Sequence, residues 1–222
     1  GLSNGQVLIA QHNYKVTYPD DVRLITPSLA FPYGDAPITL DEQGRALSQV
    51  AMSSDSDGLV LAASVGRELV GTTVSVTRNL MTGAETRNER ALTLEAASGD
   101  VRQILIDPLR QWMYVVNGEQ YVDVLALRQG GELNGRYRVL EGTGKSVTSA
   151  SLMLGGISLI IGDSSGGLAQ WFMVRGNGNP QLTRVRGFDQ QEGNAIALIQ
   201  PEERRKVFLS LDAEGQLGVY NS

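Results

Sequence analysis

The sequence predicts an all-β fold in which one four-stranded unit is repeated along the chain. Short apolar runs with alternating polar positions recur throughout the 222 residues, which is the period-2 pattern of half-buried strands. Turn residues separate these runs at intervals of about 8 to 12 positions. Most of the 26 glycines lie between the runs, where tight turns need them. No stretch has a convincing helical period, so we expect no substantial helix.

Four comparable units appear when the chain is aligned on its short apolar runs. The equivalent positions are Ala51, Ile104, Ser151 and Ala197, so successive units lie 53, 47 and 46 residues apart. Each run is followed by a polar or glycine loop, a second apolar run, a turn and a third alternating strand. The first three units continue into a fourth strand. Four strands in about 40 to 50 residues are typical of a β-propeller blade.

We therefore predict a single β-propeller domain over residues 1–222, with about five four-stranded blades, or a part of a larger propeller. The approximate blades are 5–45 (irregular), 46–98, 99–145, 146–193 and 194–222 (incomplete). The last unit stops after its third strand, and an early strand is available to complete it. Three runs are predicted to be equivalent inner strands, each in a different sheet, and the most buried segments: Ile104–Asp107, Ser151–Leu154 and Ala197–Gln200.

A repeated turn chemistry supports this division. Asp-x-x-Gly occurs at Asp163–Gly166, Asp212–Gly215 and Asp41–Gly44, and Asn117-Gly118 occupies a corresponding place. An Asp or Asn side chain can accept hydrogen bonds from the backbone two residues on, and Gly adopts the left-handed conformation. We interpret these segments as structural hairpin turns. Of the two tryptophans, Trp112 and Trp171, at least one is expected to be largely buried.

Composition excludes several classes of function. A net charge of −5, a pI near 5.0 and 6% aromatic residues disfavour nucleic acid as a partner. The absence of cysteine removes disulfides, thiolate metal sites and cysteine nucleophiles. No apolar window reaches the roughly 20 residues that span a bilayer. The chain opens on GLSNGQVLIA without an initiator methionine, and we expect a domain excised from a longer protein.

Two motifs resemble ligand sites without meeting their requirements. Glu141–Thr148 ends in Gly-Lys-Ser like a phosphate-binding loop, but Val139 stands where the first glycine belongs and the stretch links two strands. Ser53–Ser64 resembles a calcium loop around Asp55 and Asp57, but serines occupy its first and last ligand positions. We predict connecting loops at both places.

The remaining candidates do not form a catalytic pattern. His12 is the only histidine, and no neighbouring nucleophile or orienting acid accompanies it. The adjacent carboxylates Asp20-Asp21, Asp41-Glu42 and Glu202-Glu203 are expected in solvated turns. The last pair is followed by a basic cluster, Arg204, Arg205 and Lys206, which we interpret as part of a solvated surface loop. We therefore predict no enzyme, and no catalytic, cofactor-binding or metal-binding residues.

The C-terminal units carry a family resemblance. GGISLIIGDSSGGLAQWFMVR, LTRVRGFDQQEGNAIALIQPEERRKVFLSLDAEGQLGVYNS and DVRQILIDPLRQWMYVV resemble the periplasmic insert of the long-form phosphate ABC transporter permease of the Pst system. The resemblance covers about residues 99–222 well and the N-terminal third weakly. It implies a WD40-like propeller on the periplasmic side of the bacterial inner membrane, cut from a membrane-embedded parent chain.

This resemblance implies an accessory role in phosphate import through protein–protein interaction. The implied partners are transporter subunits or the periplasmic phosphate-binding protein, and no phosphate site is carried over because the transport pathway lies in membrane helices. Two alternatives stay open: a free-standing periplasmic scaffold propeller, and a hydrolase or lyase with its site at the central channel of the propeller.

Overall fold

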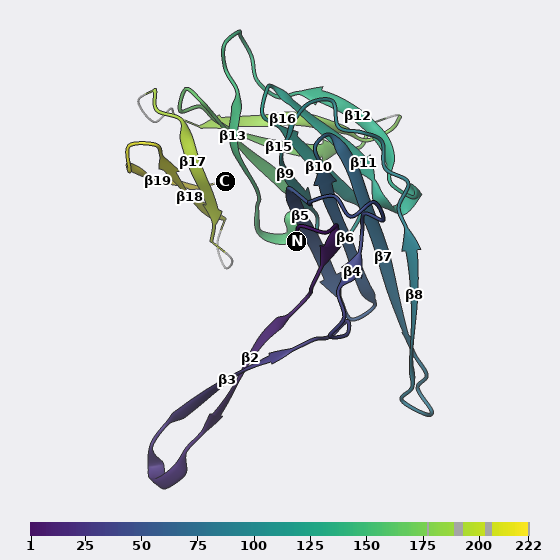
Figure 1. Cartoon of the computed structure of the whole chain (residues 1–222). Coiled ribbons are helices and arrows are strands. Elements are labelled where there is room, and N and C mark those ends of the chain that lie inside the picture. Colours follow the sequence, from purple (N-terminus) through teal and green to yellow (C-terminus); the bar gives the residue numbers. More distant parts are fainter. Residues whose placement is uncertain (177, 189–192, 203–205, 222) are drawn as a thin grey trace. The chain divides into compact units, whose positions relative to one another are not determined.

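The computed structural model describes residues 1–176, 178–188, 193–202 and 206–221 (Figure 1). Its chain divides into two compact units, Gly1–Leu47 and Ser48–Ser222. Strands dominate both units, and the helical elements of the described residues are three short 3-10 turns: η1 (Pro19–Asp21), η2 (Leu127–Gln129) and η3 (Leu154–Gly156). The all-β class predicted from the sequence is confirmed.

The first unit consists of two small antiparallel sheets. β1 (Gln6–Val7) pairs with β4 (Ile38–Thr39), and β2 (Gln11–Thr17) pairs with β3 (Leu24–Ala30) through a hairpin closed by η1. The hairpin turn places Asp20 and Asp21 at positive φ, 50° and 62°. The expectation that an early strand completes the last sheet is wrong, because each early strand takes a partner from its own unit instead.

The second unit contains consecutive antiparallel sheets, each formed by strands that follow one another in the chain. The described residues form three sheets of four strands and a final sheet of three. The first sheet consists of β5 (Gln49–Asp55), β6 (Gly58–Val65), β7 (Glu68–Arg78) and β8 (Glu85–Ala91). The second consists of β9 (Val101–Ile106), β10 (Trp112–Asn117), β11 (Tyr121–Ala126) and β12 (Glu132–Arg138). The third consists of β13 (Val147–Leu152), β14 (Ser158–Asp163), β15 (Leu168–Val174) and β16 (Gln181–Phe188), and the fourth of β17 (Ile196–Pro201), β18 (Val207–Asp212) and β19 (Leu217–Asn221).

Aliphatic clusters between consecutive sheets form the core of this unit. Because side chains alternate along a strand, one strand supplies two clusters. In β10, Met113 and Val115 belong to the cluster shared with the first sheet, whereas Tyr114 and Val116 belong to the cluster shared with the third. A third cluster, around Phe208, joins the third and fourth sheets. The second and third sheets are therefore packed on both faces.

The predicted inner strands lie in three different sheets, as expected, but they are not the most buried runs. β9 alternates between buried and partly exposed residues, whereas every residue of β14 is buried, as are all but one of β6 and of β10. The first strand of each sheet is an edge strand, whereas the second has a hydrogen-bonded neighbour on either side. Burial therefore peaks at the second strand.

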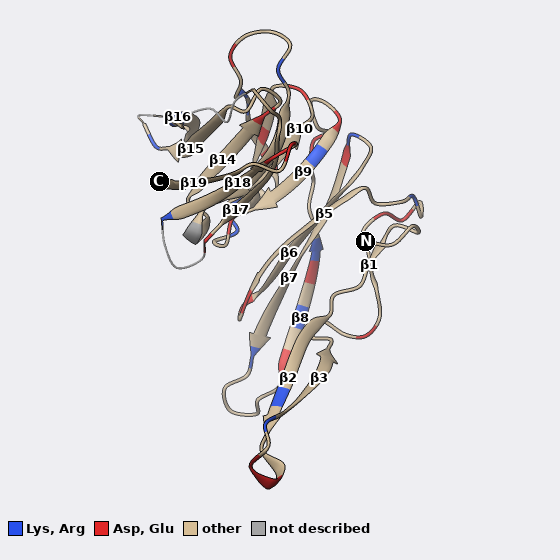
Figure 2. Ribbon diagram, turned by 90° about the vertical axis from the view of Figure 1, so that its left-hand side faces the viewer, with Lys and Arg blue, Asp and Glu red and all other residues tan. Residues whose placement is uncertain are grey.

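The last strand of each of the first three sheets is also an edge strand, and it is strongly charged. β8 carries acidic and basic residues in alternation (Figure 2), and β12 and β16 are likewise rich in arginine. Charges on an edge strand oppose pairing with a further chain. β19, the corresponding edge of the fourth sheet, contains no charged residue.

The predicted Asp-x-x-Gly hairpin turns at Asp163 and Asp212 are confirmed, whereas Asp41–Gly44 is a turn with Gly44 at φ 71° that follows β4 without joining two paired strands. Asp163 Oδ1 accepts hydrogen bonds from the N–H groups of Ser165 (2.7 Å) and Gly167 (2.9 Å), and Gly166 has φ 84°. Asp212 and Gly215 repeat this geometry between β18 and β19. Asn117 Oδ1 likewise accepts bonds from the N–H groups of Glu119 and Tyr121, but Gly118 is not left-handed.

Candidate functional site

A cavity of about 250 Å³ opens where the second and third sheets meet, and we call it the inter-sheet pocket. β12 and the loop that follows it form one wall, and β14, β15 and β16 form the other. It is lined by Arg138, Val139, Leu140, Glu141, Lys145, Ile161, Asp163, Gly167, Leu168, Ala169, Trp171, Arg184 and Phe188. Pockets with an apolar body and a few polar groups are the usual form of a binding site.

Apolar side chains make up the floor of the inter-sheet pocket. Val139, Ile161, Leu168 and Trp171 are all buried. Trp171 is 8% exposed, which confirms that one of the tryptophans is largely buried, and its indole Nε1 has no hydrogen-bond partner among the described residues. The floor of the pocket is therefore a hydrophobic surface.

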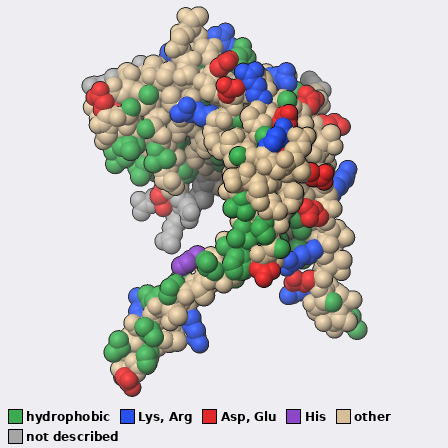
Figure 3. Space-filling view, in the orientation of Figure 1, with side chains coloured by type: hydrophobic (Ala, Val, Ile, Leu, Met, Phe, Trp, Pro, Cys, Tyr) green, Lys and Arg blue, Asp and Glu red, His purple; other side chains and the backbone are tan. Residues whose placement is uncertain are grey.

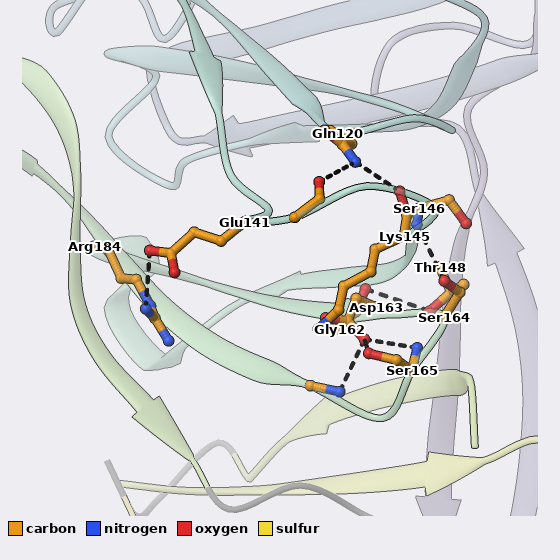
Figure 4. Close-up of polar contacts among 12 residues, drawn as sticks. Gln120, Glu141, Lys145, Ser146, Thr148, Gly162, Asp163, Ser164, Ser165 and Arg184 are labelled. Atoms are coloured by element: carbon orange, nitrogen blue, oxygen red, sulfur yellow. Dashed lines mark hydrogen bonds and ion pairs between the residues drawn. The ribbon is translucent and has the colours of Figure 1, made fainter. Parts of the chain in front are cut away.

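Charged side chains surround the mouth of the pocket (Figure 4). Lys145 Nζ lies 3.7 Å from Asp163 Oδ2, and Arg184 Nη1 lies 3.5 Å from Glu141 Oε1. The Glu141 side chain is 91% exposed, and Arg184 is about half exposed. The Glu141–Arg184 pair is exposed, and exposed pairs at such a distance contribute little stability, so Arg184 can exchange Glu141 for a group of a bound molecule at little cost.

The loop between β12 and β13 carries Lys145 and is held in place by Gln120. The Gln120 side-chain amide donates to the carbonyl of Gly142 (3.1 Å) and to that of Lys145 (3.2 Å). Ser146 N–H donates to Ser164 Oγ at 3.1 Å. Because the loop joins two strands and this amide already has a partner, the Gly-Lys-Ser motif does not form a phosphate cradle.

Asp163 has a structural role that limits its availability for contacts with a bound molecule. One carboxylate oxygen accepts bonds from the backbone of Ser165 and Gly167 and from the Ser165 hydroxyl, which lies 2.8 Å away. The other oxygen faces Lys145. The cations at the mouth, Arg138, Lys145 and Arg184, outnumber the carboxylates of Glu141 and Asp163. The mouth is therefore slightly cationic on a chain of net charge −5.

The other sequence candidates lie away from this pocket. The calcium-like segment forms the tight β5–β6 hairpin, where the Asp55 carboxylate pairs with Arg110 and accepts the N–H of Asp57. His12 lies near the start of β2, exposed and in the first unit. In the described part of the chain, no three His, Asp or Glu side chains are grouped to hold a metal ion.

Among the described residues, the adjacent carboxylates do not assemble into an acid–base pair. Asp20 and Asp21 lie exposed in η1, as expected, but the expectation of a solvated side chain is wrong for Asp41, which is buried because it forms an ion pair with Arg45 at 2.8 Å. The hydrogen bond from the Arg45 side chain holds the pKa of Asp41 below its ordinary value. Of the remaining segment, Glu203, Arg204 and Arg205 lie outside the described residues.

Sequence reasoning missed the inter-sheet pocket. Its charged mouth combines two residues that lie about 40 positions apart in the sequence. Lys145 belongs to the Gly-Lys-Ser segment, which is predicted to be a connecting loop, and Arg184 belongs to β16. Strand alternation predicts which residues face inward, but it does not predict which loop lies over which sheet. Only the packing of the two sheets brings these side chains together.

Comparison with solved structures identifies the fold. The Dos1 propeller matches with a TM-score of 0.56 at 14% identity, covering 89% of this chain and 47% of its own. Sqt1 from Chaetomium thermophilum matches with a TM-score of 0.56 at 12% identity, covering 99% of this chain and 52% of its own. The computationally designed Ika4 protein matches with a TM-score of 0.50 at 15% identity, covering 82% of this chain and 95% of its own.

The chain has a β-propeller fold. It spans about half the length of Dos1 and Sqt1 in these matches, and its described sheets form an open series, which is the partial propeller that the sequence predicts. No family model and no curated protein matches the chain. Among the described residues, no helix has the length and apolar character required to cross a membrane.

Proposed function

We propose that this propeller is a non-catalytic protein-interaction domain and that the inter-sheet pocket receives an extended segment of its partner. The observation that carries the proposal is the pocket itself: an apolar floor between two rigid sheets, with weakly paired ions around its mouth. An aliphatic or aromatic side chain of the partner fits the floor. A carboxylate beside it pairs with Arg184 in place of Glu141, or with Lys145, which keeps its contact with Asp163.

The proposal extends to the biological setting. The resemblance of residues 99–222 to the periplasmic insert of Pst-type permeases supports a domain that serves phosphate import from the periplasmic side of the inner membrane. The periplasmic phosphate-binding protein and the other transporter subunits are then the partners. In this proposal the domain contacts protein and does not bind phosphate itself. No observation on the described residues favours the alternative of a hydrolase or lyase.

Binding to a purified phosphate-binding protein of a Pst system tests this proposal. Biolayer interferometry with the immobilised 222-residue chain is expected to show saturable binding. Lys145→Glu and Arg184→Glu each reverse a charge at the mouth and are expected to weaken binding about tenfold or more, since close charge pairs at interfaces are worth at least about 1.4 kcal/mol. Arg78→Glu is the matched control, because Arg78 is exposed on the first sheet.

Three results would contradict the proposal. They are the absence of binding to the phosphate-binding protein and to the other transporter subunits, an unchanged affinity in both pocket variants, and an equal loss in Arg78→Glu. Circular dichroism of each variant separates a loss of contact from a loss of folding.

A further inference from the structure

A second recess lies at the opposite end of the second and third sheets from the inter-sheet pocket. The inter-sheet pocket contains the turn between β14 and β15, whereas this recess contains the turns that precede β10 and β14 and the segment that follows β15. It consists of two adjoining cavities of about 150 and 370 Å³, which share the lining residues Gln111, Trp112, Arg175 and Pro180. We call the two cavities together the turn groove.

The larger cavity of the turn groove is cationic. Arg128 and Arg175 line it, and its other described lining residues are uncharged. Both arginines are exposed, and neither side chain has an ion-pair partner among the described residues. Glu132 pairs with the lining residue Ala126 across the sheet but does not itself line the cavity. The residues that line this cavity therefore carry two positive charges and no counter-charge.

Several other arginines of the second unit have acidic partners. Arg67 pairs with Asp100 at 2.8 Å, and Arg78 pairs with Glu85 at 3.1 Å. Basic and acidic side chains are interspersed over the face drawn in Figure 3. On a chain of net charge −5, two unpaired cations in one cavity create a local positive potential, which favours an anionic ligand.

Trp112 provides an apolar surface to both cavities. Its side chain is partly exposed, and its indole N–H has no hydrogen-bond partner among the described residues. Leu109 and Ile157, which are 61% and 65% exposed, line the smaller cavity. Aromatic rings pack well against an indole, whose N–H is normally bonded at an interface. The groove thus offers a stacking surface beside two guanidinium groups that recognise carboxylates.

Asp107 fixes the turn that carries Trp112. Its Oδ1 accepts hydrogen bonds from the N–H groups of Gln111 at 2.6 Å and Trp112 at 2.8 Å. Arg110, in the same turn, has a left-handed φ of 53°. Asp107 lines the smaller cavity but is only 5% exposed, and these bonds occupy its carboxylate. This side of the groove is therefore formed before a ligand arrives, which lowers the entropic cost of binding.

We propose that the turn groove binds an extended acidic peptide segment of a partner protein. A ring side chain of the peptide packs on Trp112, and carboxylates beside it pair with Arg128 and Arg175. Charge complementarity selects this occupant, since the unpaired arginines attract carboxylates while the net charge of −5 opposes a polyanion such as nucleic acid. Two adjoining cavities suit an extended chain, because a small anion would contact the arginines alone.

Isothermal titration calorimetry of the 222-residue chain with the capped peptide Ser-Asp-Phe-Glu-Asp-Ser tests this proposal. We expect saturable binding with a dissociation constant of roughly 10 to 100 μM, as for a peptide that fills one small groove. Arg128→Glu and Arg175→Glu are each expected to weaken binding at least about tenfold, because each places a carboxylate against those of the peptide. Arg90→Glu is the matched control: Arg90 is exposed on β8 without an ion-pair partner among the described residues, and this variant is expected to bind like the unmodified chain.

Further measurements define the ligand and the site. The neutral peptide Ser-Asn-Phe-Gln-Asn-Ser is expected to bind at least about tenfold more weakly, and about 1 mM phosphate is expected not to displace the acidic peptide, because two exposed arginines alone are too few donors for a free oxyanion. Lys145→Glu changes the inter-sheet pocket and is expected to leave the affinity for the peptide unchanged. Arg175→Gln removes the charge with little change of size, and it is expected to weaken binding with unchanged circular dichroism.

The absence of saturable heat with the acidic peptide would overturn the proposal. So would equal affinity for the neutral peptide, displacement by phosphate, or a loss in Arg90→Glu or Lys145→Glu that equals the loss in Arg175→Glu. Tighter binding of an oligothymidylate of about ten nucleotides would assign the groove to nucleic acid instead. Because neither Arg128 nor Arg175 lines the inter-sheet pocket, these results are distinguishable from a failure of partner binding there.

Discussion

Gly167 donates its backbone N–H to the carboxylate of Asp163 at 2.9 Å, and the two residues close the turn between β14 and β15. The contact is so close that a β-carbon at position 167 would overlap the carboxylate. This turn also shapes one side of the inter-sheet pocket, since both residues line it.

Gly167→Ala is therefore expected to destabilise the domain. Asp163 cannot move away without losing its bonds to Ser165, so we expect a cost of about 1 to 3 kcal/mol in the free energy of unfolding. Gly118→Ala is the matched control: nothing lies within 4 Å of its added carbon and its φ is not positive, so stability should stay within about 0.5 kcal/mol. Urea denaturation measures both, and equal midpoints for the two variants would contradict this account of the turn.

The two tryptophans are expected to differ in their contribution to stability. Trp171 belongs to the cluster between the second and third sheets, whereas Trp112 only packs against its margin. Trp171→Ala removes a buried side chain and should lower the free energy of unfolding by about 3 to 5 kcal/mol. Trp112→Ala should cost clearly less. Chemical denaturation followed by circular dichroism tests the order, and a reversed order would show that the cluster is assigned wrongly.

Stability should fall at acid pH in part through Asp212. Burial by itself raises the pKa of this carboxyl, but hydrogen bonds from the Gln216 and Glu214 backbones and the Asn194 side chain outweigh burial and hold the pKa below its ordinary value. A lowered native pKa means that the ionised group stabilises the fold above its unfolded pKa of about 3.9, and that this stabilisation is lost as the pH falls through the native value.

Asp212→Asn removes this titration. Its free energy of unfolding is expected to be lower than that of the unmodified chain at pH 7 and to approach it below about pH 4. The exposed residue Glu95 provides a control for the loss of one surface carboxylate, Glu95→Gln, whose denaturant midpoint at pH 7 should match that of the unmodified chain. Denaturant midpoints measured from pH 2 to 7 report the difference. Parallel profiles for Asp212→Asn and the unmodified chain would refute the role assigned to this carboxylate.

Free phosphate is expected not to bind. Recognition of an oxyanion needs several converging donors, such as arginine forks or backbone amides. At the inter-sheet pocket the cations face carboxylates, and the Ser146 amide of the Gly-Lys-Ser motif is already bonded. Calorimetric titration should show no saturable heat up to about 1 mM phosphate, a range that includes binding as weak as −4 kcal/mol. Stoichiometric binding that is lost on changing Arg204 and Arg205, which lie outside the described residues, would make the domain a phosphate sensor.

The sequence by itself determined the local structure of this protein. Alternating side chains specify strands because the backbone period is two, and the Asp163 and Asp212 turns follow from side chains that bond their own backbone. These signals need only neighbouring residues, so the repeated four-stranded unit, the absence of long helices and the placement of the Gly-Lys-Ser segment between strands could all be predicted.

Only the tertiary structure decided the properties that depend on distant residues. Burial peaks in β14 and not in β13 because an edge strand lacks one neighbour, a fact of sheet order that composition does not encode. Lys145 meets Asp163, and Arg184 meets Glu141, only because one loop lies against the next sheet. Leu209 and Leu211 have the same alternation as the buried residues of β14. Their exposure depends on whether another sheet packs there, and a strand carries the same pattern whether or not its partner is present.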